Sequence, residues 1–277
     1  MCRWIAYSGG PVYLEEVLFK PKHSLIDQSL AARSGATTTN GDGFGVGWYG
    51  TGAVPGLYKG VQPAWSDENL HDLASQIKTP MFMAHVRATT GTAVQRTNCH
   101  PFRHKNWLFQ HNGAIREFAR VKRDLMLAIS PGLFAEISGS TDSEIMFYLA
   151  LTFGLENGPV VAIEKMIGFI EDVGRKHRVD HPLQMTLAIL DGHTLYAFRY
   201  SSEGSSRTLF HSADVATLRN RFPNVRQFSD DTRAVVSEPL GNIENAGEVW
   251  VEIPEASAVV IAAGNVEKAK LRPRLPA

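Results

Sequence analysis

The stretch Leu183-Gln-Met-Thr-Leu-Ala-Ile-Leu-Asp-Gly-His-Thr-Leu-Tyr-Ala-Phe-Arg-Tyr200 predicts a β-hairpin. Apolar side chains recur at every second residue from Leu183 to Ile189, which is the period of a half-buried strand. Asp191-Gly192 follows and precedes a second strand-like run, His193 to Tyr200, and this dipeptide is typical of two-residue hairpin turns. We therefore expect antiparallel sheet in the second half of the chain.

Short strands are expected on both sides of this hairpin, at Phe44 to Tyr49, Met81 to Thr89, Trp107 to His111, Ala234 to Ser237, Glu248 to Ile253 and Ala258 to Ala262. Helical periodicity covers three segments: Ile115 to Ile129, a helix that starts at Thr141 with a Thr141/Glu144 capping box, and about Pro159 to Arg178. Pro11 to Asn40 is expected to be a long irregular connection. Strands followed by helices and then a hairpin indicate sheets packed with helices rather than alternating βαβ units.

The composition limits the domain count and the partners. The chain has 277 residues, and 44% of them are hydrophobic, enough for one large core. We expect a single domain over residues 2–263 and a loosely held tail over residues 264–277. Lys plus Arg and Asp plus Glu each total 28, so the sequence favours neither a nucleic-acid nor a membrane partner. Only two cysteines and no long apolar run predict a cytoplasmic location.

Cys2 is the first candidate catalytic residue because of its position. If Met1 is removed, Cys2 carries both a thiol and a free α-amine, which titrates at about 7.7–8.0 and can accept the thiol proton. The alternative is an ordinary buried cysteine that follows the start codon.

Three other segments carry candidate binding groups. Arg87 ends an apolar strand, and its planar fork suits either a substrate carboxylate or a structural ion pair. Asn112-Gly113 supplies two N–H donors that could form an oxyanion hole, but Asn-Gly is also a common turn. Asp142, at the start of the expected helix, could hold a substrate ammonium group or simply stabilise the helix end.

The sequence predicts no metal site and no cofactor. Cys99, His100 and His104, like His177 and His181, do not supply a complete four-ligand zinc pattern, and Pro101 and Pro182 break helical spacing. We expect Cys99 to be structural.

Taken in order, these pieces resemble the class II glutamine amidotransferases, which are N-terminal nucleophile hydrolases. The matching segments are Met1-Cys2, Asp42-Gly-Phe-Gly45, His85-Val-Arg-Ala-Thr-Thr-Gly91, Asn98-Cys-His-Pro-Phe102, His111-Asn-Gly113 and Thr141-Asp-Ser-Glu144. Val235-Val-Ser-Glu-Pro-Leu240 is similar to the ending of free-standing members. The resemblance implies an α+β, four-layer αββα sandwich without an attached synthase domain.

The resemblance also implies the site residues. Cys2 would attack the γ-carbonyl of glutamine or of a γ-glutamyl amide, and its α-amine would act as the base. Asn112 and Gly113 would hold the oxyanion, Arg87 the substrate α-carboxylate, and Asp142 its α-ammonium; Thr90, Gly91 and His111 would complete the substrate site. Relatives that supply ammonia to a synthase often have an aromatic residue after the arginine. Arg87-Ala-Thr-Thr-Gly91 lacks it and is one residue shorter, which implies a more open pocket.

Three functions remain open. The first is an amidohydrolase of glutamine or a γ-glutamyl compound, which could pass ammonia to a separate synthase or partner subunit. The second is a degradative γ-glutamyl peptidase acting on glutathione-like or ergothioneine-pathway compounds. The third is a non-catalytic regulatory subunit that keeps the fold, which retention of Met1 would favour.

Overall fold

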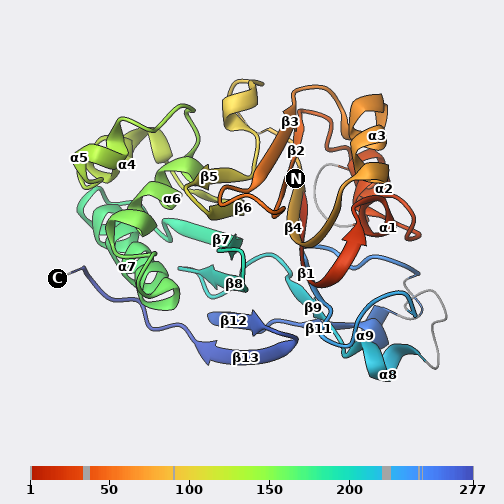
Figure 1. Ribbon diagram of the computed structural model, residues 1–277. Helices are drawn as coiled ribbons and strands as arrows, with labels where there is room; N and C mark the ends of the chain where they lie inside the picture. The colour runs from red at the N-terminus through yellow and green to blue at the C-terminus, as the bar shows by residue number, and fades with distance from the viewer. Residues whose placement is uncertain are drawn as a thin grey trace.

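The computed structural model describes residues 2–33, 38–89, 91–219, 226–242, 244 and 246–276. Two antiparallel sheets lie face to face, and helices cover the outer face of each sheet (Figure 1). Each layer buries an apolar face against the next, which is how a four-layer arrangement forms separate cores on both sides of each sheet. The expected αββα sandwich is confirmed.

The seven-stranded sheet has the order β11-β9-β10-β1-β4-β2-β3. Its strands are β1 (Arg3–Tyr13), β2 (Phe44–Trp48), β3 (Gly56–Gly60), β4 (Lys78–Val86), β9 (Phe210–Ser212), β10 (Arg233–Val236) and β11 (Trp250–Glu252). β1 lies in the middle, between β10 and β4. The residue just before β1 is therefore held between two neighbouring strands.

The six-stranded sheet has the order β13-β12-β8-β7-β6-β5. Its strands are β5 (Phe102–His104), β6 (Trp107–Ile115), β7 (Leu183–Leu190), β8 (Thr194–Ser201), β12 (Ser257–Ala262) and β13 (Asn265–Lys270). The predicted hairpin is confirmed as β7 and β8. Asp191 Oδ1 accepts the N–H groups of His193 and Thr194, and Gly192 adopts a φ of 96° that favours glycine.

The helices fall into two groups. Near the seven-stranded sheet are α1 (Glu15–Leu18), α2 (Leu25–Leu30), α3 (Glu68–Gln76), α8 (Val215–Arg219) and α9 (Ala246–Val249). On the six-stranded sheet are α4 (Phe118–Leu127), α5 (Pro131–Phe134), α6 (Asp142–Thr152) and α7 (Pro159–Lys176). α6 is buried all round, because it packs against α4, α7 and β6. No helix in the described ranges is long and apolar enough to cross a membrane.

The core between the two sheets includes Trp4 and Ala6 of β1, Met83 of β4, and Leu108 of β6. Successive strand residues point to opposite faces, so Cys2 lies on the same inner face as Trp4 and Ala6. Ile5 and Tyr7 of β1 point the other way and belong to the core on the side of the outer helices. The candidate nucleophile therefore points between the sheets.

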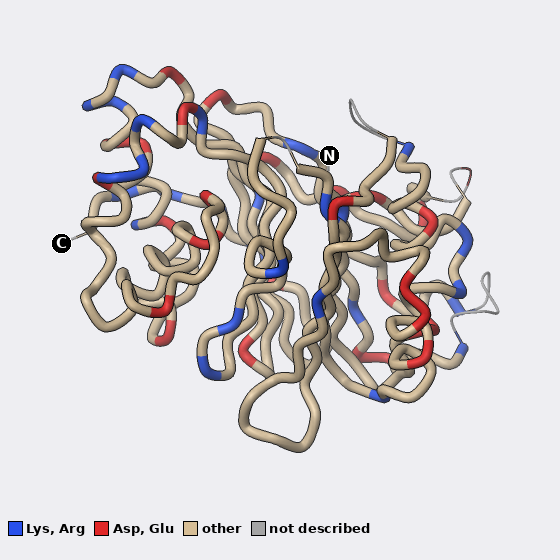
Figure 2. The backbone as a smooth tube through the Cα atoms, turned by 90° about the horizontal axis from the view of Figure 1, so that it is seen from above, with Lys and Arg blue, Asp and Glu red and all other residues tan. Residues whose placement is uncertain are grey.

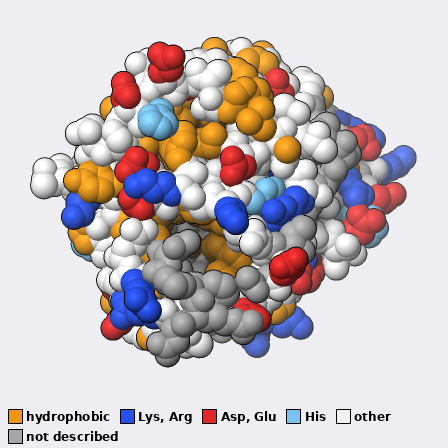
Figure 3. Space-filling model, turned by 90° about the vertical axis from the view of Figure 1, so that its right-hand side faces the viewer, with side chains coloured by type: hydrophobic (Ala, Val, Ile, Leu, Met, Phe, Trp, Pro, Cys, Tyr) orange, Lys and Arg blue, Asp and Glu red, His pale blue; other side chains and the backbone are white. Residues whose placement is uncertain are grey.

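On the outer side of the seven-stranded sheet, Tyr7, Val17, Phe228 and Trp250 line part of a cavity of about 690 Å³. Figure 3 faces the side of the molecule on which these outer helices lie, and it shows apolar side chains between charged ones. This cavity is on the face of β1 opposite to Cys2. Figure 2 shows basic and acidic positions interspersed along the backbone.

Several sequence expectations need correction. The described part of the stretch from Pro11 to Asn40 is not wholly irregular: β1 continues to Tyr13, and α1 and α2 follow, with a Ser24/Asp27 capping box at α2. The helix expected from Ile115 begins only at Phe118, because Ile115 still belongs to β6. The strand expected to reach Thr89 also ends earlier, because β4 stops at Val86.

Two further corrections concern chain ends and caps. The stretch after residue 263 is not a loose tail: β13 pairs with β12, and Leu271 is buried. Thr141 caps α6 by accepting the Glu144 N–H at 3.2 Å, as predicted. The other half of the expected capping box is not shown, because the Glu144 carboxylate accepts N–H groups of Ser138 and Gly139 instead.

Candidate active site

Cys2 directly precedes β1 and is half-buried. The register of β1 and β4 pairs Arg3 with Val86, so the next position places Cys2 beside Arg87. The Ala88 N–H donates to Cys2 Sγ at 3.4 Å, so the thiol lies against the backbone where the chain leaves β4. The structure thus brings together two of the residues expected in the site.

The carbonyl group of Cys2 is held from both sheets. Asn112 Nδ2 of β6 donates to Cys2 O at 2.8 Å, and Arg3 Nη1 donates to the same oxygen at 2.9 Å. An amide nitrogen has two N–H groups, so Asn112 has a second one for another acceptor. Cys2 and Asn112, which are 110 positions apart in the sequence, therefore meet where the two sheets face each other.

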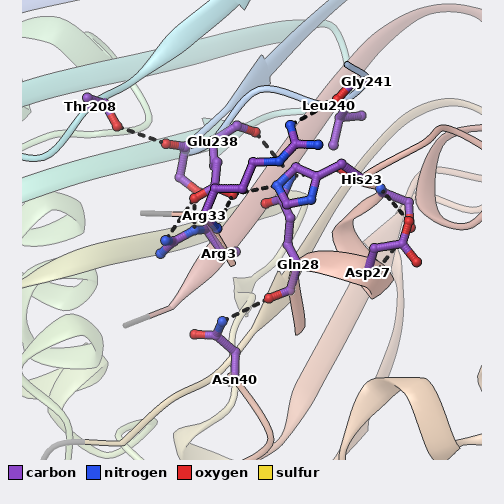
Figure 4. Close-up of polar contacts among 12 residues, drawn as sticks. Arg3, His23, Asp27, Gln28, Arg33, Asn40, Thr208, Glu238, Leu240 and Gly241 are labelled. Atoms are coloured by element: carbon purple, nitrogen blue, oxygen red, sulfur yellow. Dashed lines mark hydrogen bonds and ion pairs between the residues drawn. The ribbon is translucent and has the colours of Figure 1, made fainter. Parts of the chain in front are cut away.

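A buried ion pair fixes Arg3 in turn. Arg3 Nη2 lies 2.9 Å from Glu238 Oε2, and both side chains are at most 4% exposed (Figure 4). Glu238 Oε1 accepts the Arg33 N–H at 2.9 Å and lies 2.6 Å from His23 Nε2. Burial raises the Glu238 pKa, but Arg33, His23 and Arg3 outweigh it, so the net pKa is lowered. A charged Glu238 thus holds the residue after Cys2.

The same network reaches α2. Gln28 Nε2 donates to the carbonyl oxygens of His23 and Glu238, and Asn40 Nδ2 donates to Gln28 O at 3.1 Å (Figure 4). Segments near residues 3, 28 and 238 are therefore connected by polar contacts beneath the start of β1.

Arg87 is 4% exposed, and its contacts are with neutral oxygens. Its Nη2 donates to Thr92 Oγ1 at 2.6 Å and to Thr89 Oγ1 at 3.3 Å, while Nη1 lies 3.4 Å from Asp42 O. No carboxylate of the described residues forms an ion pair with it. The structural ion pair that the sequence left open is therefore not observed in this part of the chain, and the guanidinium charge can pair with an anionic group.

The loop after β4 folds back on itself. The Thr89 hydroxyl donates to Thr92 O at 2.7 Å, and the Thr89 N–H donates to Asp42 Oδ2 at 2.8 Å. Gly91 is exposed at the outside of this loop, with a φ of 98° that favours glycine. Thr90, a predicted substrate-binding residue, lies outside the described residues.

Gly113 is required by its surroundings. A Cβ atom there would lie 2.0 Å from Gln184 O and 2.6 Å from His111 Nε2. The Ile115 N–H donates to Asp142 Oδ2 at 2.8 Å rather than to β7. Because N–H groups alternate between the two edges of a strand, the Gly113 N–H lies on the same edge of β6 as that of Ile115.

His111 and Asp142 are joined through Ser143. His111 Nδ1 lies 2.8 Å from Ser143 Oγ, and Asp142 Oδ1 accepts the Ser143 N–H at 2.8 Å. Asp142 is the first residue of α6, where the positive end of the helix dipole stabilises a carboxylate. Burial lowers the pKa of His111, so a neutral imidazole faces this carboxylate.

Further ionisable side chains are buried at the same end of the sandwich. Burial, with Arg87 adding to it, lowers the pKa of His85 to about 3, and the His85 and His100 rings lie 4.3 Å apart. Burial also lowers the pKa of Lys59 to about 8. Among the described residues, no group of three His, Cys, Asp or Glu side chains is placed to hold a metal ion.

Cys99 is fully buried, and its thiol donates to Gly60 O at 3.4 Å. Burial raises its pKa, which disfavours the thiolate form. The geometry supports its proposed structural role.

The contacts of Arg3 and Glu238 with the Cys2 segment were not predicted from the sequence, although Glu238 belongs to the Val235–Leu240 motif that the sequence analysis singled out.

The chain belongs to the class II glutamine amidotransferase family. The family described as "Glutamine amidotransferases class-II" matches residues 20–275, most of the chain. The protein is similar to the probable glutamine amidotransferase DUG3 of Saccharomyces cerevisiae, with 33% identity over 94% of this chain and 82% of that protein.

A second relative is the γ-glutamyl-hercynylcysteine sulfoxide hydrolase of Mycobacterium tuberculosis. It is 32% identical over 42% of this chain and 50% of its own length. The yeast relative thus matches nearly the whole chain, whereas the Mycobacterium tuberculosis relative matches less than half of it.

Solved structures agree with the family and the fold. A glutamine aminotransferase class-II domain protein from Silicibacter pomeroyi has a TM-score of 0.73 and 32% identity, covering 98% of this chain and 100% of that one. The glutamine phosphoribosylpyrophosphate amidotransferase of B. subtilis has a TM-score of 0.63 at 15% identity, covering 99% of this chain and half of that one. The latter likeness shows the N-terminal nucleophile hydrolase fold alone.

Proposed function

We propose that the protein is an amidohydrolase that cleaves the γ-amide bond of glutamine or of a γ-glutamyl compound through Cys2. The observation that carries this proposal is the position of Cys2 between two groups. Arg87, a buried guanidinium with only neutral oxygen acceptors, lies at the neighbouring position just after β4, and the Asn112 amide donates to the Cys2 carbonyl oxygen. A thiol, a guanidinium group and an amide N–H donor thus occupy one end of the space between the sheets, which supports these roles.

The first chemical step forms a thioester. After removal of Met1, the α-amine of Cys2 takes the thiol proton, and Sγ attacks the γ-carbonyl carbon. The second Asn112 N–H and the Gly113 N–H stabilise the oxyanion. The C–N bond then breaks, and the α-ammonium of Cys2 returns the proton to the departing ammonia or amine.

The second step consumes water. The same α-amine takes a proton from a water molecule, whose oxygen attacks the thioester carbon. The C–S bond then breaks, and the α-ammonium returns the proton to Sγ, which releases glutamate and the free thiol. During both steps Arg87 holds the α-carboxylate of the γ-glutamyl group, and Asp142 holds its α-ammonium. Asp142 Oδ1 accepts the N–H and the hydroxyl group of Ser143, whereas Oδ2 accepts only the Ile115 N–H and keeps a further lone pair for the ammonium.

The experiment is a steady-state assay of glutamate release from glutamine and from γ-glutamyl peptides. Wild-type protein and Cys99→Ala are expected to release glutamate, whereas Cys2→Ala is expected to be inactive. Full activity of Cys2→Ala, or no glutamate from any of the substrates with wild-type protein, contradicts the proposal. A stimulated rate with a second protein would indicate an ammonia-accepting synthase or a partner subunit.

A degradative γ-glutamyl peptidase is the second candidate. The short loop that begins at Arg87, in which Gly91 is exposed, favours it because a bulky leaving group needs an open pocket. The Mycobacterium tuberculosis relative, whose name states a γ-glutamyl substrate, also supports the peptidase candidate. The ratio of kcat/KM for γ-glutamyl peptides to that for glutamine separates the two.

A further inference from the structure

Arg207 lies in the segment that leads into β9, and its guanidinium is incompletely paired. Its Nε donates to Gln184 Oε1 of β7 at 3.1 Å. Its Nη1 is buried and has no hydrogen-bond partner among the described residues. A buried guanidinium N–H without an acceptor is unfavourable, so this arrangement favours binding of an anionic group.

The sheet register places Arg207 level with Cys2. β9 pairs with β10 through Val236 and Phe210, and β10 pairs with β1 through Val236 and Ile5. The alignment continues beyond β9, because Thr208 Oγ1 donates to Ser237 O at 3.2 Å. Counting back along both strands brings Arg207 to the level of Cys2, two strand spacings or about 10 Å away.

Arg207 also faces the same way as Cys2. Leu209 belongs to the core between the sheets, and the two-residue period of an extended chain directs Arg207 to that side. Its contact with Gln184, on the opposite sheet, agrees with this direction. Gln184 O in turn closes over Gly113. Arg207 therefore contacts the strand that pairs with the Asn112 and Gly113 segment of β6.

The charges of these groups interact. Burial lowers the pKa of Arg207, the negative charge of a Cys2 thiolate opposes that effect, and Arg3 adds to it. Arg87 lies beside Cys2 on the β4 side, whereas Arg207 lies on the β10 side. The nucleophile is thus flanked by two guanidinium groups in one row across the sheet.

We propose that Arg207 binds a carboxylate on the amine side of the scissile bond, so that the preferred substrate is a γ-glutamyl amino acid rather than glutamine. This inference rests on the proposed function of Cys2 and Arg87. A γ-glutamyl amino acid carries one carboxylate on each side of its γ-carbonyl group, as the two guanidinium groups lie on each side of Cys2. Glutamine has only an NH₂ group on the amine side.

The test compares kcat/KM for three substrates: γ-glutamyl-alanine, γ-glutamyl-alaninamide and glutamine. The first two differ only in the charge that Arg207 would bind. Wild-type protein is expected to prefer γ-glutamyl-alanine over its amide by about 10- to 100-fold, the size of one charge-assisted hydrogen-bonded contact. Arg207→Met is expected to bring that ratio close to one, and Arg207→Lys to keep part of it.

Arg116→Met is the matched control, because Arg116 forms an exposed ion pair with Glu203 and should leave the ratio unchanged. A wild-type ratio near one overturns the inference even if Arg207→Met does not fold. A high ratio that persists in folded Arg207→Met overturns the role of Arg207. If glutamine and the alaninamide are cleaved as well as γ-glutamyl-alanine, only this inference fails; if no substrate is cleaved, the proposed function fails too.

Discussion

Replacing Glu238 with Gln should destabilise the protein by about 3 kcal/mol. Removing one charge from a buried ion pair costs about 3–5 kcal/mol, and the lower end applies because Gln keeps the volume and one acceptor oxygen. Both partners, Arg3 and Glu238, are almost fully buried, so solvent screens their interaction little. This loss is a large fraction of the roughly 5–15 kcal/mol by which a domain is stable.

The measurement is urea unfolding of the wild type, Glu238→Gln and Glu203→Gln. With a slope of about 3 kcal/mol per molar urea, the midpoint of Glu238→Gln should fall by about 1 M. Glu203→Gln is the matched control, because its pair with Arg116 is exposed and should contribute at most about 1 kcal/mol. A Glu238→Gln midpoint indistinguishable from that of the control would refute the reasoning.

The pH dependence gives a second check on the same variant. The folded protein lowers the Glu238 pKa, so this carboxylate contributes stability above its unfolded pKa of about 4.3. The contribution is lost as the pH falls through the folded pKa. The difference between wild type and Glu238→Gln should therefore be full near neutral pH and should shrink in acid. A stability difference that grows in acid would contradict a lowered pKa of Glu238 in the folded protein.

Three further predictions follow from the site and the chain end. Asn112→Ala should lower turnover by about 10²–10³-fold, measured as glutamate release, and a near-wild-type rate would contradict its role as an oxyanion donor. Cys99→Ser should leave turnover near the wild-type rate, because the hydroxyl can still donate to Gly60 O; a large loss would give Cys99 a catalytic role. Deletion of residues 264–277 should lower the free energy of unfolding by at least about 2 kcal/mol, since it removes β13 and buried Leu271; an unchanged urea midpoint would mean that this segment does not contribute.

The elements predicted well are those specified by local sequence. The hairpin of β7 and β8 needs only a period of two around Asp191-Gly192, and α6 needs only the Thr141 cap before an apolar run. The missed elements depend on pairing. β13 carries charged residues such as Glu267 and Lys268, and its exposed edge position tolerates them.

The residues of the candidate site also fall into those that sequence motifs identify and those that only the fold brings into place. Ordered motifs singled out Cys2, Arg87 and Asn112, and the structure brings these three together, while their chemical roles stay predictions. Arg207 belongs to no motif, and its position depends on the register of three strands and on a contact with the opposite sheet. Such a residue becomes visible only when the chain is folded.

The most direct test of the central claim is the intact mass of the purified protein before and after treatment with a glutamine-like electrophile, 6-diazo-5-oxo-norleucine. We predict a starting mass that lacks Met1 and a single adduct that peptide mapping assigns to Cys2, with Cys99→Ser labelled equally. Active protein that retains Met1, or an adduct on Cys99 with Cys2 unmodified, would contradict the account.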